Sequence, residues 1–565
     1  MKEHMVITIM ANVGFSTPFT AYIIWVQYLP IYFNQAWASS FGYQVLVALS
    51  TNLIGYGLAG LTRHFLVYPS NAIWPSNLAT IALGRAFHSG TNTPANGWTV
   101  SRMRWFTYCF VAMFIYFWFP NYLVAAMSYF NWTTWIAPDS THLAAITGTY
   151  GGLGLNPLPT WDWNQCTVVG DPLINPFYSI FNSLLGTLST FPVIVFIWYT
   201  NTWNTAYIPI NSNGAFDNTG ARYEVLNMVD ENGLFNEAAY KAYSPLYLSA
   251  GNSLHYGMYF ALYTSTITHT YLYNRREIVA GLKNVISRKS AFADSKDVHT
   301  RLMRSYREVP EYAYLAVLVV SIVLGAAGVS AYPTHTTPVV VLYGVFLALI
   351  FCIPCGIIMS ITNIEVPLNV IAELFGGLWF PGNTTAMNYF KAYGYVTTLH
   401  TLHFAQDLKL AHYTHIPPWI TFNCQMVATI VSTFVCTAIL NYQMTQIPDI
   451  CTPNQKGRFT CPNINTFFAG SVLWGTLGSK KMFGSGAIYN ALLWWFLVGA
   501  LMPVPFYYLR KKWKLFQYFH VPVFLRGGIV WSPYNLSHAW AGVPSTFVFN
   551  YYIKRNFLAW WSKYN

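Results

Sequence analysis

Long apolar blocks separated by short polar loops constrain this 565-residue chain more than any other feature. Residues 314–332, 338–361 and 487–508 form such blocks, and none of them contains Lys, Arg, Asp or Glu. The hydrocarbon core of a bilayer is ~30 Å thick and offers the backbone no hydrogen-bond partners, so ~20 apolar residues cross it as a helix. The pattern therefore predicts an all-α, polytopic transmembrane helical bundle with about 12–14 membrane segments.

The composition agrees with a protein embedded in a lipid bilayer. Charged residues make up only 8% of the chain and aromatic residues 18%, and Trp and Tyr favour the depth of the lipid headgroups. No polar linker divides the sequence, so we predict a single integral membrane domain over residues 1–565. The net charge of +12 lies in short clusters between the apolar blocks, which favours cytoplasmic loops over a nucleic-acid-binding surface.

The distribution of basic residues predicts the orientation of the loops. Residues 274–310 contain nine Lys and Arg against four acids, whereas residues 201–250 contain two against five. Because cytoplasmic loops are enriched in Lys and Arg, we predict that loop 274–310 is cytoplasmic and loop 201–250 external. Counting crossings onward predicts a cytoplasmic loop over residues 391–415 and an external loop over residues 442–486.

The cysteines differ in their surroundings. Cys352 and Cys355 lie within an apolar run and are expected to be buried thiols. Cys451 and Cys461 lie in the predicted external loop, where an oxidising environment permits a disulfide between them.

Two membrane segments are interrupted by proline and glycine, residues 66–83 and residues 363–382, about half a chain apart. In transporters, interrupted segments at matching places often mark the substrate site, because unwound backbone is tolerated only where it lines a cavity. This placement predicts broken or re-entrant segments in two pseudo-repeat halves with a cavity between them. Two proline kinks filled by neighbouring side chains are the alternative.

Three carboxylates are candidates for binding protons or substrate: Glu373 and Glu365 in the second interrupted segment, and Asp162 after a glycine-rich stretch. A carboxyl at membrane depth costs ~2.5–3.5 kcal/mol, so it usually faces water or a partner. For the two glutamates the alternative is a cap on a broken helix end. For Asp162 it is an Asx turn that holds the local loop.

Other chemistry has little support in the sequence. His400, His403, His412 and His415 lie in the predicted loop 391–415, but no acid or cysteine stands at a ligand interval, so we expect solvated histidines and no metal site. No nucleotide-binding or catalytic motif stands in a supporting context, so we predict no cofactor and no enzyme activity. Any pumping by this chain would draw on an ion gradient.

Several segments, taken in their order along the chain, carry a resemblance to a known family. They are KEHMVITIMANV (2–13), FGYQVLVALSTNLIGYGLAGLTRHFLVYPSNAIWPSNL (41–78), NWTTWIAP (131–138), GLGLNPLPTWDWN (152–164), YTNTWNTAYIPINSN (199–213), KDVHTRLMRSYREVPEY (296–312), DLKLAHYTHIPPW (407–419), CTPNQKGRFTCP (451–462) and WWSKYN (560–565). In these segments the chain resembles the peptide-transporting branch of the oligopeptide transporter family.

The resemblance implies a secondary active transporter that imports short peptides, such as tetrapeptides, pentapeptides or glutathione-like molecules, together with protons as the coupling ion. It implies a multi-pass protein of the plasma membrane. The family's Asn-Pro-Gly motif and further hydrophobic segments are absent, so the chain is expected to be truncated at both ends. The family's Lys-Ile-Pro-Pro-Arg motif reads here as His415, Ile416, Pro417, Pro418 and Trp419. The alternatives are a metal-chelate transporter of the sister branch, a polytopic membrane enzyme and an inactive fragment.

The predicted site combines a carboxyl at its centre with apolar and amide walls. Glu373, assisted by Asp162 or Glu365, would meet the peptide amine and the proton, and half-helix N-termini would meet the carboxylate. The predicted walls of the cavity are Trp74, Asn156, Trp161, Trp163 and Asn369.

Overall fold

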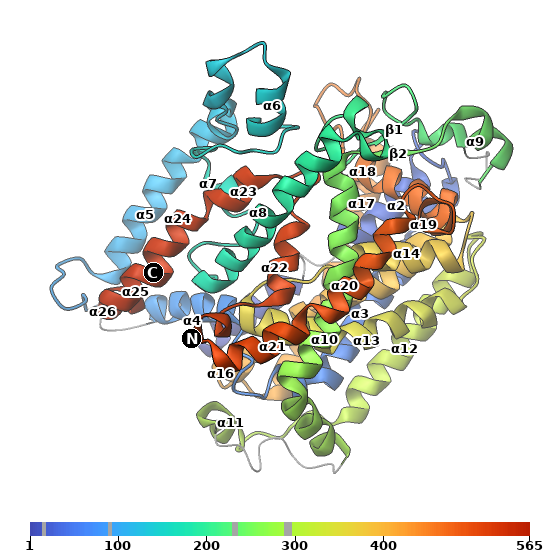
Figure 1. Ribbon diagram of the computed structural model, residues 1–565. Coiled ribbons are helices and arrows are strands. Elements are labelled where there is room, and N and C mark those ends of the chain that lie inside the picture. Colours follow the sequence, from blue (N-terminus) through green and yellow to red (C-terminus); the bar gives the residue numbers. More distant parts are fainter. Residues whose placement is uncertain (14–17, 89–92, 229–234, 287–296, 565) are drawn as a thin grey trace.

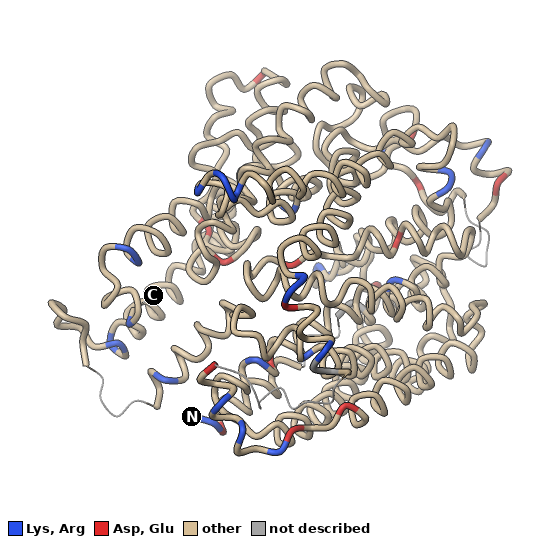
Figure 2. Tube along the Cα trace, turned by 60° about the horizontal axis from the view of Figure 1, so that its bottom comes forward, with Lys and Arg blue, Asp and Glu red and all other residues tan. Residues whose placement is uncertain are grey.

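The computed structural model describes residues 1–13, 18–88, 93–228, 235–286 and 297–564. Nearly all elements in these residues are helices, as Figure 1 shows, which confirms the predicted all-α class. The described strands are β1 (Ala215–Phe216) and β2 (Tyr247–Leu248), which pair antiparallel. Figure 2 shows how sparse charge is along the trace, with long stretches free of Lys, Arg, Asp and Glu.

The α-helices are α1 (Lys2–Val13), α2 (Pro18–Tyr28), α3 (Phe41–Leu66), α4 (Pro75–His88), α5 (Arg102–Tyr116), α6 (Thr141–Thr147), α7 (Trp163–Cys166), α8 (Phe177–Tyr199), α9 (Glu237–Tyr243), α10 (Ala250–Ile286), α11 (Val298–Met303), α12 (Glu311–Ser330), α13 (Val339–Thr362), α14 (Asn369–Trp379), α15 (Thr384–Lys391), α16 (Thr397–Tyr413), α17 (Pro418–Gln446), α18 (Pro462–Ser471), α19 (Ser479–Phe483), α20 (Trp495–Leu501), α21 (Pro503–Lys512), α22 (Val521–Gly528), α23 (Leu536–Ala541), α24 (Val543–Thr546), α25 (Lys554–Asn556) and α26 (Leu558–Tyr564). The short 3₁₀ or π segments are η2 (Ala36–Ser39), η3 (Phe119–Leu123), η4 (Ala125–Met127), η5 (Trp132–Ile136), η6 (Thr202–Tyr207), η7 (Val225–Met228), η8 (Ala392–Val396), η9 (Val472–Gly478), η10 (Asn490–Trp494), η11 (Lys514–Gln517) and η12 (Phe547–Ile553).

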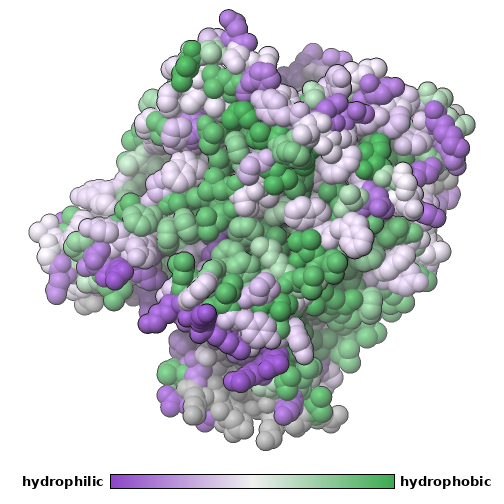
Figure 3. All heavy atoms as spheres, in the orientation of Figure 1, coloured by the Kyte–Doolittle hydropathy of each residue, from purple (hydrophilic) through white to green (hydrophobic). Residues whose placement is uncertain are grey.

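Within the described residues, seven helical segments are long and apolar enough to cross a membrane. They are Phe41–Leu66, Arg102–Leu123, Phe177–Tyr199, Glu311–Ser330, Val339–Thr362, Pro418–Gln446 and Asn490–Lys512. Hydrophobic residues cover a broad part of the surface in Figure 3, with hydrophilic residues toward the top and bottom of the view. Several predicted segments are short or broken in the structure, so the total of about 12–14 crossings stays a prediction.

Helix α3 is the most buried of the seven apolar segments, with 78% of its apolar window buried. Its glycines, which lack a side chain, let neighbouring helices approach closely. A Cβ atom on Gly60 would lie 1.9 Å from the ring of Tyr314, and one on Gly57 would lie 2.9 Å from Leu318 Cβ. Both partners belong to α12. Small residues at such contacts favour association of helices in a membrane, where burial of apolar surface gives little gain.

Helix α10 connects the two loops whose charges predicted the orientation of the chain in the membrane, and its last turns include residues 274–286 of the second loop. In Figure 1, β1, β2 and α9 of loop 201–250 lie at the top, and α11 of loop 274–310 lies at the bottom. Opposite ends are what the prediction requires. Residues 229–234 and 287–296 of these loops, with Arg288, Lys289 and Lys296, lie outside the described residues.

The prediction of a loop over residues 391–415 is wrong. These residues form the end of α15, then η8, α16 and a short connection, and His400 and His412 are buried rather than solvated. The polar side chains that suggested a loop have partners inside the bundle, as Lys409 Nζ donates to Val67 O at 2.6 Å. The last turn of α16 still reaches the predicted cytoplasmic end, where the His412 ring lies 3.3 Å from Thr300 Oγ1 of α11.

A candidate solute-binding site at a broken helix

The centre of the candidate site is a buried ion pair between Glu373 of α14 and Lys391 of α15. Lys391 Nζ lies 2.7 Å from Glu373 Oε1, and each side chain is 7% exposed. A tight turn joins the two helices, with Gly382 at φ +81°, a conformation that glycine adopts without strain. The ammonium of Lys391 also lies 4.7 Å from the ring centre of Phe467, a cation–π contact with α18.

Close backbone contacts fix the α14–α15 hairpin in place. A Cβ atom on Gly377 would lie 2.3 Å from Trp474 O, and one on Gly475 would lie 2.7 Å from Thr384 Cα. Ser479 Oγ donates to Leu374 O at 2.7 Å. The carboxylate of Glu373 is therefore positioned by η9 and α19 as well as by its own helix.

The break before α14 is stabilised by a tyrosine from α10. Tyr263 donates its hydroxyl hydrogen to Pro367 O at 3.1 Å and accepts a hydrogen bond from the N–H of Ile371 at 3.2 Å. One side chain thus supplies partners that a continuous helix would supply itself. Nearby, Asn369 Oδ1 is buried without a hydrogen-bond partner among the described residues.

Two further opposite charges lie near the same break, with no direct ion pair between them in the described residues. Glu365, in the non-helical segment 363–368, interacts electrostatically with Arg526 of α22. Both side chains are half-buried, and Arg526 Nε has no hydrogen-bond partner within the described part of the chain.

Tyrosines from α10 and η8 connect the two charge pairs. Tyr259 and Tyr395 each interact electrostatically with Glu365, Glu373 and Arg526. We call the charged and polar set with its tyrosines the Glu373–Arg526 cluster, which comprises Glu365, Asn369, Glu373, Lys391, Arg526, Tyr256, Tyr259, Tyr263 and Tyr395. It offers two cations, two carboxylates and several aromatic hydroxyls inside a largely apolar bundle.

Comparison with known proteins shows the family of the chain. A family model described as OPT oligopeptide transporter protein matches residues 1–565. The chain belongs to this family. It is 38% identical to the sexual differentiation process protein isp4 of Schizosaccharomyces pombe over 580 residues, which covers the whole chain and 71% of that relative.

Two further relatives of this OPT-family chain carry transporter names. It is 36% identical to oligopeptide transporter 2 of Saccharomyces cerevisiae and 34% identical to glutathione transporter 1 of Schizosaccharomyces pombe, in both cases over its whole length. It spans 65% and 67% of those two relatives. Members of the family are transporters rather than enzymes, and membership places the OPT-family chain in a membrane.

Two basic members of the cluster were missed by the sequence analysis. Lys391 was assigned to a cytoplasmic loop, and Arg526 was assigned no role. Each is the single Lys, Arg, Asp or Glu in a long stretch, Lys391 within 382–406 and Arg526 within 515–553. A solitary cation in such a run requires a partner at membrane depth, and this signal would have found both.

Asp162 does not belong to the cluster. Its Oδ1 accepts a hydrogen bond from the Asn164 N–H at 3.0 Å and its Oδ2 accepts one from Ser128 Oγ at 2.8 Å. It caps α7, which lies on the left of Figure 1, far from α14 on the right. The Asp162 carboxylate therefore stabilises a local turn, which was the alternative prediction. The prediction that it assists Glu373 is wrong, because the two residues lie in separate parts of the structure.

The predicted walls near Asp162 are also displaced from the cluster. Trp161 is 49% exposed, Trp163 opens α7, and Asn156 donates its amide to Phe130 O at 2.8 Å. All three serve the local packing around α7. Of the five predicted wall residues, Asn369 lies at the broken helix beside Glu373.

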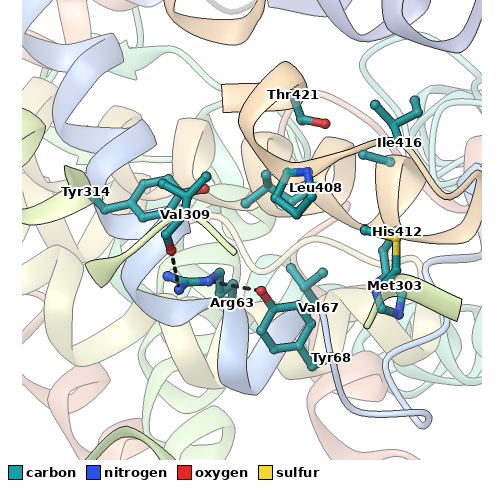
Figure 4. Close-up of a pocket in the computed structure, with 12 residues that line it drawn as sticks. Arg63, Val67, Tyr68, Met303, Val309, Tyr314, Leu408, His412, Ile416 and Thr421 are labelled. Carbon is teal, nitrogen blue, oxygen red and sulfur yellow. Dashed lines mark hydrogen bonds between the residues drawn. The ribbon is translucent and has the colours of Figure 1, made fainter. Parts of the chain in front are cut away.

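Trp74 seals the interior rather than lining a cavity. Its indole N–H donates to Leu66 O at 2.9 Å, and its backbone N–H donates to Ser360 O at 2.7 Å. The segment that follows α3 instead borders a separate small pocket, shown in Figure 4, to which Val67 and Tyr68 contribute. Trp74 bonds the last turn of α13, three residues before the second interrupted segment begins. The small pocket is lined by Val67 and Tyr68 of the first segment and by none of residues 363–382, so a cavity shared by the two segments stays a prediction.

The small pocket is organised by Arg63 of α3. Its guanidinium lies 2.6 Å from Glu311 Oε1, and it donates to Val309 O at 3.0 Å and to the hydroxyl of Tyr68 at 3.1 Å. These bonds tie α3 to the start of α12. In Figure 4 Arg63 points toward Val309 and Tyr68, and its role is to hold these segments together.

The His415–Trp419 motif borders the same pocket. Ile416 and Pro418 line it, and His415 Nε2 lies 3.2 Å from His299 Nδ1. Burial lowers the pKa of His415, and the positive charge of His299, Lys2 and Arg85 lowers it further. Pro417 precedes α17 and Trp419 lies in its first turn, so the motif joins α16 to α17.

The predicted external loop 442–486 contains a disulfide. Cys451 and Cys461 are joined, with their Cα atoms 4.8 Å apart. Cys352 and Cys355 of α13 are buried free thiols.

Proposed function

We propose that this OPT-family chain carries short peptides across the membrane and that the Glu373–Arg526 cluster is where the peptide binds. The observation that carries the proposal is a set of opposite charges buried at a broken helix inside a membrane bundle. Buried charge is costly in such a bundle, so it is usually retained for a task. The names of the relatives, oligopeptide and glutathione transporters, support the same class of substrate.

The cluster suits a molecule with a charge at each end. The peptide carboxylate is drawn to Arg526 and to the N-terminus of α14, where helix N–H groups carry a partial positive charge. The peptide amine is drawn to Glu365, and both pairs form without any unpaired charge. The rings of Tyr256, Tyr259 and Tyr395 supply walls that accept varied side chains through their faces and hydroxyls.

Proton coupling is part of the proposal, through the Glu373–Lys391 pair. The pair is neutral as a whole, and a proton on Glu373 leaves the Lys391 ammonium without its partner. The unpaired charge of Lys391 then adds to that of Arg526 in attracting the peptide carboxylate, so binding of the proton and binding of the peptide favour each other. The membrane potential then supplies ~2.3 kcal/mol per charge per 100 mV. Import across the plasma membrane follows the direction of that gradient.

Uptake by cells deficient in peptide transport tests the proposal. Cells expressing the chain should accumulate radiolabelled tetrapeptide, pentapeptide or glutathione, faster at acidic external pH. Glu373→Gln should abolish the pH dependence, while Glu237→Gln, which alters an exposed acid of loop 201–250, should leave it unchanged. Accumulation of an iron chelate in place of all peptides would contradict the proposed substrate. A pH dependence that survives in Glu373→Gln would contradict the role of that carboxyl.

A further inference from the structure

One face of α10 carries a row of polar atoms that have no hydrogen-bond partner among the described residues. The row consists of His255 Nδ1, Thr266 Oγ1, both ring nitrogens of His269, Thr270 Oγ1 and Tyr273 Oη, all of them buried atoms. Together with Tyr259, positions 255, 259, 266, 270 and 273 are separated by four, seven, four and three residues, and His269 lies four residues before Tyr273, so these side chains share one face of the helix. The row runs from the level of the cluster toward the end of α10 that continues into loop 274–310.

Helix α22 and the residue before it lie against this face. The rings of His269 and His520 have their centroids 4.2 Å apart, and Arg526 interacts electrostatically with Tyr259 and His255. As α10 descends from 259 to 269, its partners change from 526 to 520, so the two helices run antiparallel. His520 Nδ1 and Arg526 Nε are likewise without partners in the part of the chain that the structure describes.

The seam between α10 and α22 ends in a group of basic side chains. The guanidinium of Arg510 lies 3.9 Å from the ring centre of Tyr273, and Arg510 begins the cluster Arg510, Lys511, Lys512 and Lys514. The sequence predicts that this cluster is cytoplasmic. The charged and titratable groups along the seam are Glu365, Arg526, Tyr259, His255, His269, His520, Tyr273, Tyr507 and Arg510.

A row of unpaired polar atoms is expensive in a closed protein. Natural proteins usually satisfy each such group with protein or water, because an unsatisfied buried group destabilises the fold. Helix α10 is also too polar to count among the seven apolar membrane segments, although Thr266 and His269 are 0% and 4% exposed. The buried polar atoms on this face would gain hydrogen-bond partners by meeting water.

We infer that the seam between α10 and α22 is the inner half of the solute route, closed in this structure and filled with water when the two helices separate. The inference rests on the proposed function, because it supplies the path from the Glu373–Arg526 cluster to the cytoplasmic end. The opposite face of α10 differs in character. Ile267 and Tyr271 are 41% and 63% exposed there, on the outer side of the bundle, which the proposal places against lipid.

Cysteine labelling tests the seam without measuring transport. The six free cysteines, Cys109, Cys166, Cys352, Cys355, Cys424 and Cys436, are replaced by serine or alanine, and the Cys451–Cys461 disulfide is kept. Thr266→Cys and Thr270→Cys are introduced separately, so that misfolding of one leaves the other informative. Ile267→Cys and Tyr271→Cys are the matched controls from the lipid-facing side. The probe is a charged methanethiosulfonate applied to permeabilised membranes during exposure to a tetra-alanine peptide.

We expect the two seam cysteines to be labelled at least tenfold faster than the two controls. Labelling of all four at the same slow rate would overturn the inference, because it would mean that the seam stays dry. The readout separates the two proposals. Fast labelling in a chain that carries no peptide rejects the proposed substrate alone, whereas peptide transport with slow labelling rejects the seam alone.

Discussion

Glu373 and Lys391 show how two residues eighteen positions apart in sequence depend on each other at membrane depth. Both are buried, and the pair is 2.7 Å apart. The free-energy cost of removing one charge from water is offset only by the attraction of the other, so replacing either residue alone is destabilising. The same argument makes the pair a sensitive probe of the site.

Lys391→Met should lower the free energy of unfolding by roughly 3–5 kcal/mol, because it leaves a buried carboxylate unpaired. The double variant Glu373→Gln/Lys391→Met should recover most of that loss. Denaturant unfolding of the detergent-solubilised protein measures both. Lys241→Met is the control, since its pair with Glu237 is exposed and worth about 0–1 kcal/mol. Equal stability of the single and double variants would show that the two charges are not coupled.

Tyr263→Phe should destabilise the broken helix, because it leaves Pro367 O and the N–H of Ile371 without the hydroxyl that bonds both. A loss of about 1–3 kcal/mol is expected for unsatisfied buried groups. Tyr271→Phe, on the exposed side of the same helix, should have little effect. Thermal unfolding compares the two variants, and equal melting temperatures would mean that Tyr263 does not support the break.

Sequence reasoning at this scale found the acids and missed their partners. Glu365 and Glu373 stood out because carboxyls are rare in apolar segments. Lys391 was placed in a cytoplasmic loop by counting the membrane crossings, and such a count says nothing about the partners of a lysine. Whether a cation has a carboxylate beside it depends on the α14–α15 hairpin, a tertiary contact that sequence spacing does not specify.

At the scale of elements, helix contacts depend on positions that lack a side chain. Helices α8 and α22 approach so closely that a Cβ atom on Gly527 would lie 1.8 Å from Ser183 O, and one on Gly186 would lie 1.8 Å from Phe524 O. The seam on the other side of α22 therefore depends on this contact for its position.

Gly527→Ala should displace α22 from α8 and lower stability by about 1–3 kcal/mol, the usual cost of overpacking. Gly470→Ala is the matched control, because a Cβ there meets nothing within 4 Å and alanine favours the helix. Thermal unfolding of the two variants gives the comparison. A tolerated Gly527→Ala would mean that the α8–α22 contact is looser than described.

The helical elements were predictable from apolar length, and their ends were not. The blocks at 314–332 and 338–361 correspond closely to α12 and α13, since twenty apolar residues have few alternatives. Residues 391–415 were misread because threonine, histidine and lysine look like loop composition. In the structure their polar groups bond backbone carbonyls and neighbouring helices, as Thr401 Oγ1 bonds Thr397 O at 2.8 Å.

At the scale of the whole molecule, the loops sort by charge to opposite ends. An epitope inserted beside Thr219, in an exposed turn of loop 201–250, should bind antibody on intact cells. One inserted beside Arg304, after α11, should bind only after permeabilisation. Immunofluorescence of both epitope-tagged proteins, on intact and on permeabilised cells, checks the orientation. The reverse pattern would invert every assignment of side made from the basic residues.

The helical-bundle architecture was the feature most predictable from the sequence. The relative placement of the two interrupted segments was the least predictable. Low charge and long apolar blocks leave a helical bundle as the main solution, and the family match agrees. The two interrupted segments gave a reason to expect one shared chamber. In the structure, Val67 and Tyr68 of the first segment line the Arg63 pocket, and residues 363–368 hold Glu365 at the charged cluster. Two pseudo-repeat halves stay a prediction.

The hydrogen bond from Trp74 to Ser360 has a mechanical consequence. It ties the chain leaving α3 to the last turn of α13, just before that helix unwinds. A bond of this type lasts only while its atoms stay within about 3 Å, so α13 cannot slide past α3 unless the bond gives way. The bond therefore favours motions in which the Arg63 pocket and the start of the unwound stretch move together, because sliding α13 past α3 would break it at a cost of about 0.5–1.5 kcal/mol.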